Sequence, residues 1–257
     1  MVDIHSHILF GIDDGPQDIE ESIELLKQAI SVGYTGIVCS SHYYIGKFEN
    51  EDYDKNFEIL KQKIVEENLN IEIFKGNEFA LFPNYLEHRD RINRINNGRY
   101  ILVELKNELI YPICKEFFES LLSQGVIPVL AHIERYPHIK VRELIELYDM
   151  GVILQVNLRM VANPVNRIKY LLENRYVGVV ATDTHRFGKR DYNVSENLEK
   201  LKRNLGEEYF NIVTDTNPRK IVNNEIIERV RGEEDGIKKS NGVGSFFSCL
   251  WNRLFSK

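Results

Sequence analysis

Histidine and acidic residues recur in this chain where short apolar runs end. The first run contains His5 and His7, two residues apart, and two aspartates follow it in "GIDDGP". The last run ends in "ATDTH", in which Asp183 and His185 are again two residues apart. Alternate residues of a strand point to the same face, so each pair can act on one ligand. Because such side chains are costly to bury unpaired, the pattern predicts a bound group.

Similar side chains end the runs between these two. The residues that we expect to meet at one site are His5, His7, Asp14, His42, Glu78, Glu104, His132, Asp183 and His185. Imidazoles mixed with carboxylates, without thiolates, suit Mn²⁺, Fe²⁺ or Zn²⁺. Nine ligands exceed what one ion takes, so about two or three ions are expected. One HxH motif alone is more often structural, so the prediction depends on the joint pattern. His88 and His138 lie outside it, and we expect both to face solvent.

The elements that must position these residues alternate along the chain. Seven runs rich in Val and Ile predict strands buried on both faces of a parallel sheet, at 2–8, 35–42, 70–78, 100–105, 126–134, 151–157 and 177–185. Seven strands alternating with helices favour a β/α barrel, in which the C-terminal strand ends form one mouth. An open doubly wound sheet is the structural alternative.

Amphipathic patterns predict helices at 20–33, 111–125, 141–151 and 216–230. The predicted buried faces contain Ile23, Leu26 and Ile30 in the first helix and Ile113, Phe117 and Leu121 in the second. Each of the first three helices is expected to stop at a glycine. In the last, Asn217 is expected as the N-cap, with Pro218 at the first helical position.

Bulk properties describe an ordinary globular protein. The chain has 257 residues, 43% of them hydrophobic, which suits one large α/β domain. A net charge of −6 disfavours nucleic-acid binding through a broad basic face. Three widely spaced cysteines, Cys39, Cys114 and Cys249, indicate reduced thiols. We see neither a signal-peptide pattern nor an apolar run near the ~20 residues that span a bilayer, so a cytoplasmic location is expected.

The composition changes after Arg231. We therefore expect a domain at 1–231, followed at 232–257 by a polar linker and a short tail. From Ile237 onward there are four basic and no acidic residues, and 245–257 can form an amphipathic helix. Three interpretations stay open. The tail docks on its own body or a sister subunit, it anchors the protein weakly to an anionic membrane, or it is disordered.

Six segments together resemble a known family. They are "DIHSHILFGIDDGP", "SSHYYIGKFEN", "GNE", "RYILVEL", "AHIERY" and "ATDTH", and the match runs in order from residue 2 to about residue 222. The chain resembles the PHP (polymerase and histidinol phosphatase) superfamily. More narrowly, it is similar to the bacterial manganese-dependent tyrosine-protein phosphatases of the CpsB/CapC type. This resemblance implies a distorted (β/α)7 barrel with its metal site at the C-terminal strand ends.

The resemblance also assigns roles to residues. One ion would be held by His5, His7, Glu78 and Asp183, a second by Asp14, His42 and His185, and a third by Glu78, Glu104 and His132, with Mn²⁺ as the expected metal. Arg135 matches the family's phosphate-binding arginine, and Arg190 matches a second one, although "RDY" stands here where the family commonly has "RPP". The residues after His42 also depart from relatives that are basic there.

The expected reaction is hydrolysis of phosphotyrosine. Clustered divalent ions lower the pKa of a bound water and bind phosphoryl oxygens, while an arginine fork can clamp two of those oxygens. The resemblance implies, as substrate, the tyrosine-rich tail of a membrane-associated kinase that controls capsule or exopolysaccharide synthesis. A homo-oligomer is compatible with the sequence. A cysteine mechanism is excluded by spacing, because no cysteine is followed by arginine six positions later.

Three other functions remain open from the sequence. The first is a small-molecule phosphomonoesterase of the histidinol-phosphatase type, which would use the same ions. The second is C–N hydrolysis by an amidohydrolase, since those enzymes also carry HxH on their first strand. The third is a non-catalytic, metal-stabilised regulator of polysaccharide assembly. The apparently complete ligand set favours an enzyme.

Overall fold

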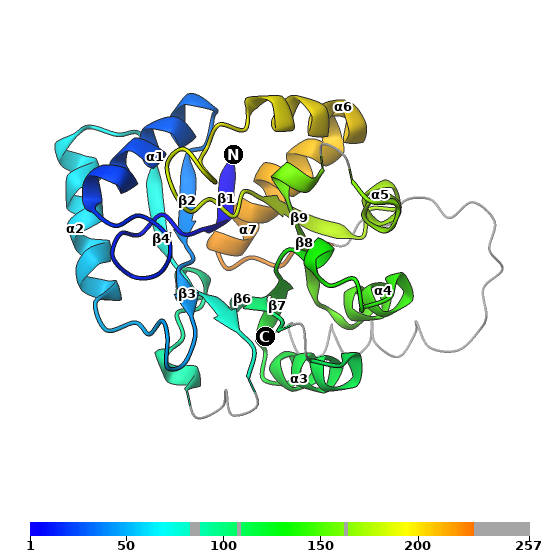
Figure 1. Ribbon diagram of the computed structural model, residues 1–257. Coiled ribbons are helices and arrows are strands. Elements are labelled where there is room, and N and C mark those ends of the chain that lie inside the picture. The colour runs from blue at the N-terminus through cyan, green and yellow to red at the C-terminus, as the bar shows by residue number, and fades with distance from the viewer. Residues whose placement is uncertain (83–87, 107–108, 162–163, 229–257) are drawn as a thin grey trace.

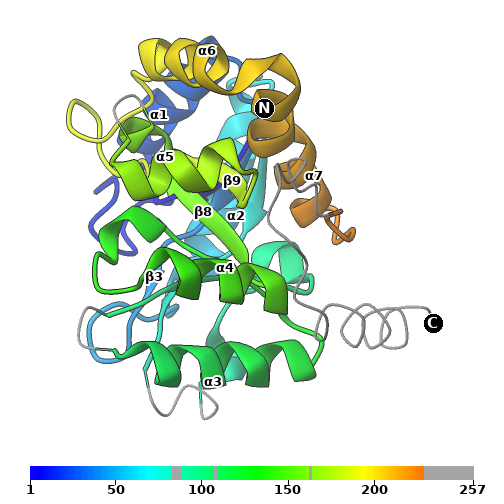
Figure 2. The same ribbon diagram turned by 90° about the vertical axis from the view of Figure 1, so that its right-hand side faces the viewer.

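The chain forms a barrel of parallel strands surrounded by helices (Figures 1 and 2). The computed structural model describes residues 1–82, 88–106, 109–161 and 164–228. The strands are β1 (Val2–Ser6), β2 (Gly36–Cys39), β3 (His42–Tyr43), β4 (Glu72–Lys75), β5 (Glu78–Ala80), β6 (Tyr100–Glu104), β7 (Ile127–Leu130), β8 (Ile153–Asn157) and β9 (Val177–Ala181). They hydrogen-bond in two sheets, β1-β2-β4 and β3-β5-β6-β7-β8-β9, and every pairing between them is parallel.

The two sheets join into one closed barrel. At one seam the Asp183 amide donates to the His5 carbonyl over 2.8 Å, and the His7 amide donates to the Thr184 carbonyl over 2.7 Å, which connects β1 to the chain after β9. At the other seam the chain itself connects the two sheets, because β2 leads into β3 and β4 leads into β5, each across a bend. The predicted distorted (β/α)7 barrel is confirmed.

The bend shows that two strand predictions were too long. The runs 35–42 and 70–78 are each two short strands rather than one. Gly76 lies at the break between β4 and β5, and a Cβ there would lie 2.5 Å from the Val38 side chain. The Glu78 amide then donates to the carbonyls of Ser40 and Ser41, 3.0 and 3.1 Å away. This local shift distorts the barrel beside His42 and Glu78, which are the first residues of β3 and β5.

Helices cover the outside of the barrel (Figure 2). They are α1 (Ile19–Ser31), α2 (Tyr53–Glu66), α3 (Tyr111–Ser123), α4 (Val141–Met150), α5 (Asn166–Glu173), α6 (Ser195–Asn211) and α7 (Asn217–Val222). Their apolar faces pack against the strands in one large core. Ile23 and Leu26 of α1 are buried as predicted, and Ile30 packs at the edge of that core. None of the helices in the described ranges is both long and apolar enough to cross a bilayer.

The prediction for the buried face of α3 was partly wrong. Phe117 and Leu121 are buried, but Ile113 is 51% exposed, and Cys114 and Phe118 take the remaining core positions. Helical spacing permits either choice, because residues 113 and 114 flank the same apolar stripe. The rotation of α3 about its own axis, as it packs on the barrel, decides which of the two is covered.

The start and extent of the last predicted helix were also wrong. A π-helical turn, Ile212–Thr216, connects α6 to α7, so Asn217 lies inside a helical stretch rather than at an N-cap. Its side chain donates instead to the Gly178 carbonyl, 2.9 Å away. Pro218 is the second residue of α7, one position from its predicted place, and the first turn of a helix tolerates its missing amide hydrogen. The α-helix ends at Val222, well before the predicted end at 230.

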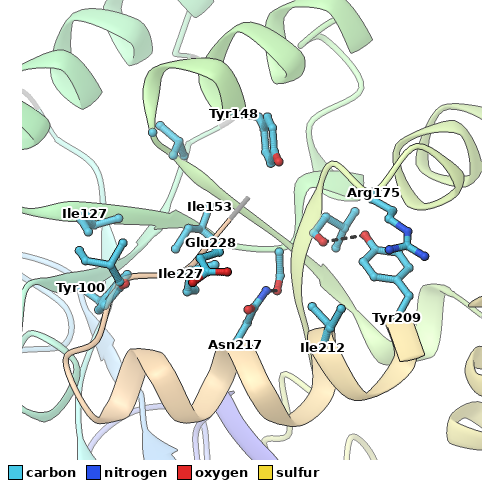
Figure 3. A pocket seen from close by; sticks show the side chains of 15 residues that line it. Tyr100, Ile127, Tyr148, Ile153, Arg175, Tyr209, Ile212, Asn217, Ile227 and Glu228 are labelled. Atoms are coloured by element: carbon cyan, nitrogen blue, oxygen red, sulfur yellow. Dashed lines mark hydrogen bonds between the residues drawn. The ribbon is translucent and has the colours of Figure 1, made fainter. Parts of the chain in front are cut away.

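The barrel interior is divided along its length. Its N-terminal half is an apolar core that includes Val2, Ile4, Leu102 and Val129. Ile221 of α7 packs against this core and closes that end of the barrel. A mostly apolar pocket lies at this end, lined in part by Tyr100, Ile153, Tyr209, Asn217 and Glu228 (Figure 3). The C-terminal half carries the polar side chains described next. The prediction for the segment 232–257 lies outside the described residues.

Candidate metal centre

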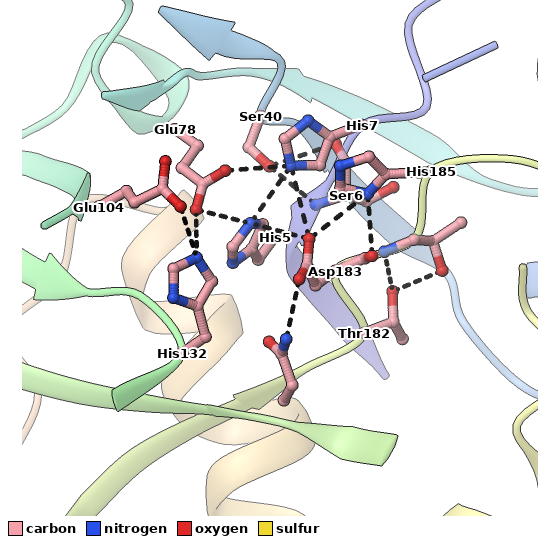
Figure 4. Close-up of polar contacts among 12 residues, drawn as sticks. His5, Ser6, His7, Ser40, Glu78, Glu104, His132, Thr182, Asp183 and His185 are labelled. Carbon is pink, nitrogen blue, oxygen red and sulfur yellow. Dashed lines mark hydrogen bonds and ion pairs between the residues drawn. The ribbon is translucent and has the colours of Figure 1, made fainter. Parts of the chain in front are cut away.

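The nine expected ligands come from different strands and meet at one mouth. His5 lies in β1 and His7 just after it, while His42, Glu78 and Glu104 lie in β3, β5 and β6. His132 follows β7, and Asp183 and His185 follow β9. Asp14 lies in the loop between β1 and α1. All these strands are parallel, so the ligands gather at one end of the barrel, and Figure 4 shows seven of the nine together. The structure thus brings together residues separated by as many as 180 positions in the chain.

The ligand atoms of these nine residues fall into four overlapping groups, each with its atoms within 4.8 Å of one another. The groups are His7, Asp14, His42 and His185; His5, Glu78 and His132; His5, His7 and Asp183; and His42, Glu78 and Glu104. His5, His7 and His132 are fully buried, whereas the Asp14 side chain is 58% exposed. Asp14 therefore closes the site on the solvent side.

Glu78 lies at the centre of the cluster. Its Oε1 lies 2.7 Å from Nε2 of His132 and 3.3 Å from Nε2 of His5. Its Oε2 lies 3.2 Å from Nε2 of His7 and 3.0 Å from Nδ1 of His42. Burial disfavours the carboxylate, but His5, His42 and His132 outweigh it and hold the pKa of Glu78 well below 4.5. An ionised carboxylate among four imidazoles can bridge cations.

Three imidazoles have one nitrogen fixed as a donor. Nδ1 of His7 donates to Asp13 Oδ2 over 2.7 Å, and Nδ1 of His185 donates to the Asp183 carbonyl over 3.0 Å. Nδ1 of His5 lies 3.1 Å from Oε1 of Gln155. In the neutral rings the lone pair is then left on Nε2. The Nε2 atoms of His5 and His7 lie only 3.3 Å apart, so two lone pairs converge where a cation fits.

Asp183 provides a second sign that these residues suit a cation. Its Oδ1 is buried and has no hydrogen-bond partner among the described residues, yet it lies 3.4 Å from both Nε2 of His5 and Nδ1 of His185. Buried polar atoms are normally satisfied, so an orphaned carboxylate oxygen among imidazoles fits a metal ion. Asp183 and His132 also have left-handed backbones, with φ of 54° and 31°. Such strain concentrates at functional sites.

Burial and neighbouring charges set the protonation of the remaining groups. Burial lowers the pKa of His132, and burial together with His7 lowers the pKa of His185 to about 2, so both rings stay neutral. Burial, reinforced by Glu78, raises the pKa of Glu104 to about 7. Neutral imidazoles are the form that binds metal.

Both expected arginines lie at the edge of this cluster. Nη2 of Arg135 forms an ion pair with Oδ2 of Asp183, and Nη1 of Arg190 lies 3.4 Å from the same oxygen. Their side chains are 39% and 38% exposed, so both reach from the buried ligands to solvent. The positions of the two arginines suit binding of a phosphate group next to the cluster of expected metal ligands, and this role remains a prediction.

Three polar side chains of the site are not among the expected ligands; the sequence pattern pointed to Asp13 without giving it a role, and it missed Gln155 and Asn157. Asp13 accepts from His7 and from the His42 amide, 2.7 Å away in each case, and so orients two expected ligands. Its Oδ1 accepts from the Gly15 amide, where a Cβ would clash with the His7 carbonyl at 2.2 Å. Gln155 and Asn157 of β8 are the other two. Their signal was available, because both are polar positions in the apolar run "GVILQVN".

The other histidines and the cysteines lie elsewhere. His138 is exposed as predicted, but His88 is half-buried with its ring against Phe82, so its expected solvent exposure was wrong. Cys39 and Cys114 are buried and unpaired, which fits their predicted packing role. Cys249 lies outside the described residues.

A distorted parallel barrel with histidines, carboxylates and arginines at its C-terminal mouth defines a class of metal-dependent hydrolases. The chain belongs to the CpsB/CapC family of capsular polysaccharide synthesis, whose family model matches residues 1–223. The tyrosine-protein phosphatase CpsB of Streptococcus pneumoniae is 32% identical over 243 residues, which cover 88% of this chain and all of CpsB.

Solved structures agree with this family and show how widely the fold is shared. A structure from work on YwqE of Bacillus subtilis and CpsB of S. pneumoniae, described as unique metal-dependent tyrosine phosphatases, has a TM-score of 0.81 at 25% identity, covering 93% of this chain and 100% of that one. Dihydropyrimidinase from Brevibacillus agri has a TM-score of 0.52 at 12% identity, covering 87% and 70%. The second likeness concerns the fold alone.

Proposed function

We propose that this protein is a metal-dependent protein-tyrosine phosphatase that hydrolyses phosphotyrosine in a protein substrate. The observation that carries the proposal is the convergence of nine potential ligands and two arginines at one barrel mouth. Its relatives in S. pneumoniae and B. subtilis are named tyrosine-protein phosphatases. The cluster lacks a cysteine, and the two described cysteines lie buried in the core, which supports metal rather than thiolate chemistry.

We propose two or three Mn²⁺ ions as the cofactor, with Fe²⁺ or Zn²⁺ as alternatives. His5, His7, Glu78 and Asp183 would hold one ion, Asp14, His42 and His185 a second, and Glu78, Glu104 and His132 a third. The geometry also places His7 within reach of the second group, so His7 lies between two of these positions. Divalent ions in such a site bind phosphoryl oxygens and make hydroxide available near neutral pH.

The protein's own groups would orient the phosphate. Arg135 and Arg190 can each donate to non-bridging oxygens as those oxygens gain negative charge during in-line displacement. Both guanidinium groups are held on Asp183 Oδ2, so the substrate meets them already oriented. The leaving group would be a phenoxide with a pKa of about 10, which needs less protonation than an alkoxide.

The rim of the mouth supports an aromatic substrate. Phe48 stacks on the imidazole of His42, with ring centroids 5.8 Å apart and planes 12° from parallel. Nζ of Lys106 lies 3.9 Å from the centre of the Tyr44 ring and donates to its hydroxyl. These rings beside the expected ligands offer apolar faces to the ring of a phosphotyrosine. Nζ of Lys47 lies 4.6 Å from the centre of the Phe48 ring, so the rim beside His42 is both aromatic and basic.

We propose a kinase as the substrate protein. Membership of a family of capsular polysaccharide synthesis supports, as the substrate, the tyrosine-rich tail of a membrane-associated tyrosine kinase, which would be dephosphorylated in the cytoplasm.

A test compares a tyrosine-phosphorylated peptide with histidinol phosphate, using purified protein loaded with Mn²⁺. Much faster turnover of the peptide is expected because of the aromatic rim. Preference for histidinol phosphate would identify a small-molecule phosphatase instead. No hydrolysis of either by metal-loaded protein would favour the non-catalytic regulator.

A further inference from the structure

β8 contributes none of the nine expected ligands, yet it carries two buried amides into the site. Gln155 is fully buried, and Asn157 is 6% exposed. As alternate residues of one strand, they point to the same side, which here is the barrel interior. Two buried carboxamides in an otherwise apolar strand are costly unless every polar atom finds a partner.

The partners form an unbroken chain of hydrogen bonds across the site. The His132 amide donates to Oε1 of Gln155 over 2.7 Å, and Nε2 of Gln155 donates to Oδ1 of Asn157 over 3.0 Å. Nδ2 of Asn157 then donates to Oδ2 of Asp183 over 2.8 Å. The chain thus begins at one expected metal ligand and ends at another.

The orientation of both amides follows from the ends of this chain. A backbone N–H can only donate, so the atom of Gln155 that meets the His132 amide must be oxygen. An ionised carboxylate can only accept, so the atom of Asn157 that meets Asp183 must be nitrogen. The bond between the two amides is consistent with both requirements. No alternative flip satisfies the two ends together.

This fixed orientation determines the tautomer of His5. Nδ1 of His5 lies 3.1 Å from the same Oε1 of Gln155, which is an acceptor. Nδ1 must therefore carry the hydrogen, and the lone pair of the neutral ring is on Nε2, 3.3 Å from Glu78 and 3.4 Å from Asp183. At the other end, Asn157 holds Oδ2 of Asp183 and leaves Oδ1 directed at the imidazoles.

We propose that Gln155 and Asn157 are positioning residues that fix the His5 tautomer and the Asp183 carboxylate as one unit for metal binding. The inference rests on the proposed metal site and adds two residues to it. Partners of metal ligands commonly contribute about 10- to 100-fold to metal affinity, because they set the direction and protonation of the ligand. Gln155 acts on His5 and on the backbone of His132, so its loss should be the more severe.

The test measures Mn²⁺ affinity by titration calorimetry, together with the His5 tautomer by ¹⁵N NMR of the metal-free protein at a pH where the ring is neutral. Gln155→Leu and Asn157→Ala should each weaken Mn²⁺ binding by about 10- to 100-fold. Gln155→Leu should also lose the single Nδ1–H tautomer of His5. The double variant should lose less than the product of the two single losses, because the residues act in one chain.

Two further variants separate positioning from general damage. Gln155→Glu keeps an acceptor for His5 and His132 but removes the donor to Asn157, so it should keep the Nδ1–H tautomer of His5 that Gln155→Leu loses; loss of that tautomer in Gln155→Glu would contradict the inference. Asn217→Ala removes a buried amide that is also 6% exposed, at the opposite end of the barrel (Figure 3). This control should bind Mn²⁺ like the wild type even where its melting temperature falls.

Wild-type affinity in Asn157→Ala, or an unchanged His5 tautomer in Gln155→Leu, would overturn the inference. If Gln155→Leu does not fold, Asn157→Ala and Gln155→Glu still decide it. Equal loss of affinity in Asn217→Ala would show general destabilisation and would also overturn it. A wild-type protein that binds no metal would instead contradict the proposed function.

Discussion

Arg135 and Asp183 form an ion pair in which the guanidinium contacts only one oxygen of the carboxylate, Oδ2. The other oxygen, Oδ1, faces His5 and His185 at 3.4 Å. Arg190 and Asn157 meet Arg135 at the same Oδ2. Asp183 therefore joins two parts of the site, because Oδ1 faces the imidazoles and Oδ2 contacts the arginines proposed to bind phosphate.

Replacing Arg135 should separate turnover from metal binding. Arg135→Ala is expected to keep the Mn²⁺ content while turnover falls by about 10²-fold or more, because a transition-state donor is lost. His5→Ala and Asp183→Ala should lose metal as well as activity. Metal analysis and steady-state kinetics on an aryl phosphate provide both measurements. Arg219→Ala, which removes an arginine paired with Asp215 away from the mouth, is the control. Loss of metal in Arg135→Ala would contradict this separation.

Activity should depend on a transition metal. Chelation is expected to abolish hydrolysis of an aryl phosphate, and Mn²⁺ should restore it best, because five of the nine ligands are imidazoles. Mg²⁺ prefers oxygen ligands and keeps its waters, so it should restore little. Rates before chelation, after chelation and after addition of each metal give the answer. Full recovery with Mg²⁺ alone would argue against the histidine-rich site.

Metal affinity should fall in mildly acidic solution. Burial opposes protonation of His5 and His7, but Glu78 and Asp183 raise the pKa of His5 above 6.5, and Asp13 raises that of His7 well above it. A raised pKa means that the metal-free site holds these protons at higher pH, and metal must displace them. Mn²⁺ affinity should therefore weaken by about tenfold per pH unit for each proton displaced. Calorimetry from pH 8.5 to 6 measures this, and a flat profile would contradict it.

The cysteines should be dispensable. Burial raises the pKa of the Cys39 thiol far above its usual value and that of Cys114 to about 11, so neither is a thiolate at pH 8. Cys39→Ala, Cys114→Ala and Cys249→Ser should each keep wild-type turnover. An alkylating reagent should leave the native enzyme active. Inactivation that is prevented by one of these substitutions would reopen thiol chemistry.

Removal of residues 237–257 should spare turnover of a small aryl phosphate, because all nine expected ligands lie upstream. If the tail is a membrane anchor, the full chain alone should sediment with anionic vesicles, weakly and in a salt-sensitive way. Neutral vesicles are the control. Equal sedimentation of both forms would exclude the anchor. A lower melting temperature of the shortened form would support docking on the protein itself.

Much of the site was determined by the sequence alone. His5 and His7 share a face because a strand has a period of two, and this holds wherever the strand lies. The ligands near the ends of successive strands meet because parallel strands in a barrel all end on the same side. Both rules use only order and spacing along the chain, so His42, Glu78 and His132 could be placed together without coordinates.

Other features depended on contacts that the chain order does not encode. Ile113 and Cys114 both suit the apolar stripe of α3, and only the rotation of the helix about its axis against the barrel decides that Cys114 is buried. Asn217 resembles a helix cap locally, but a carbonyl of β9 lies beside it in the fold and accepts its side chain. Local propensity is worth less than such a buried contact, so tertiary structure overrides it.

The side chains that hold the expected ligands show most clearly that spacing along the chain does not predict tertiary contacts. Asp13, Gln155 and Asn157 were visible as polar residues, yet nothing in their spacing identifies the atoms that they contact. Their partners, His7, His5 and Asp183, belong to other strands or to loops beyond them. A hydrogen bond requires a donor and an acceptor within about 3 Å in a suitable direction. Only the closed barrel brings these groups to that distance, so the tertiary structure decided how the ligands are held.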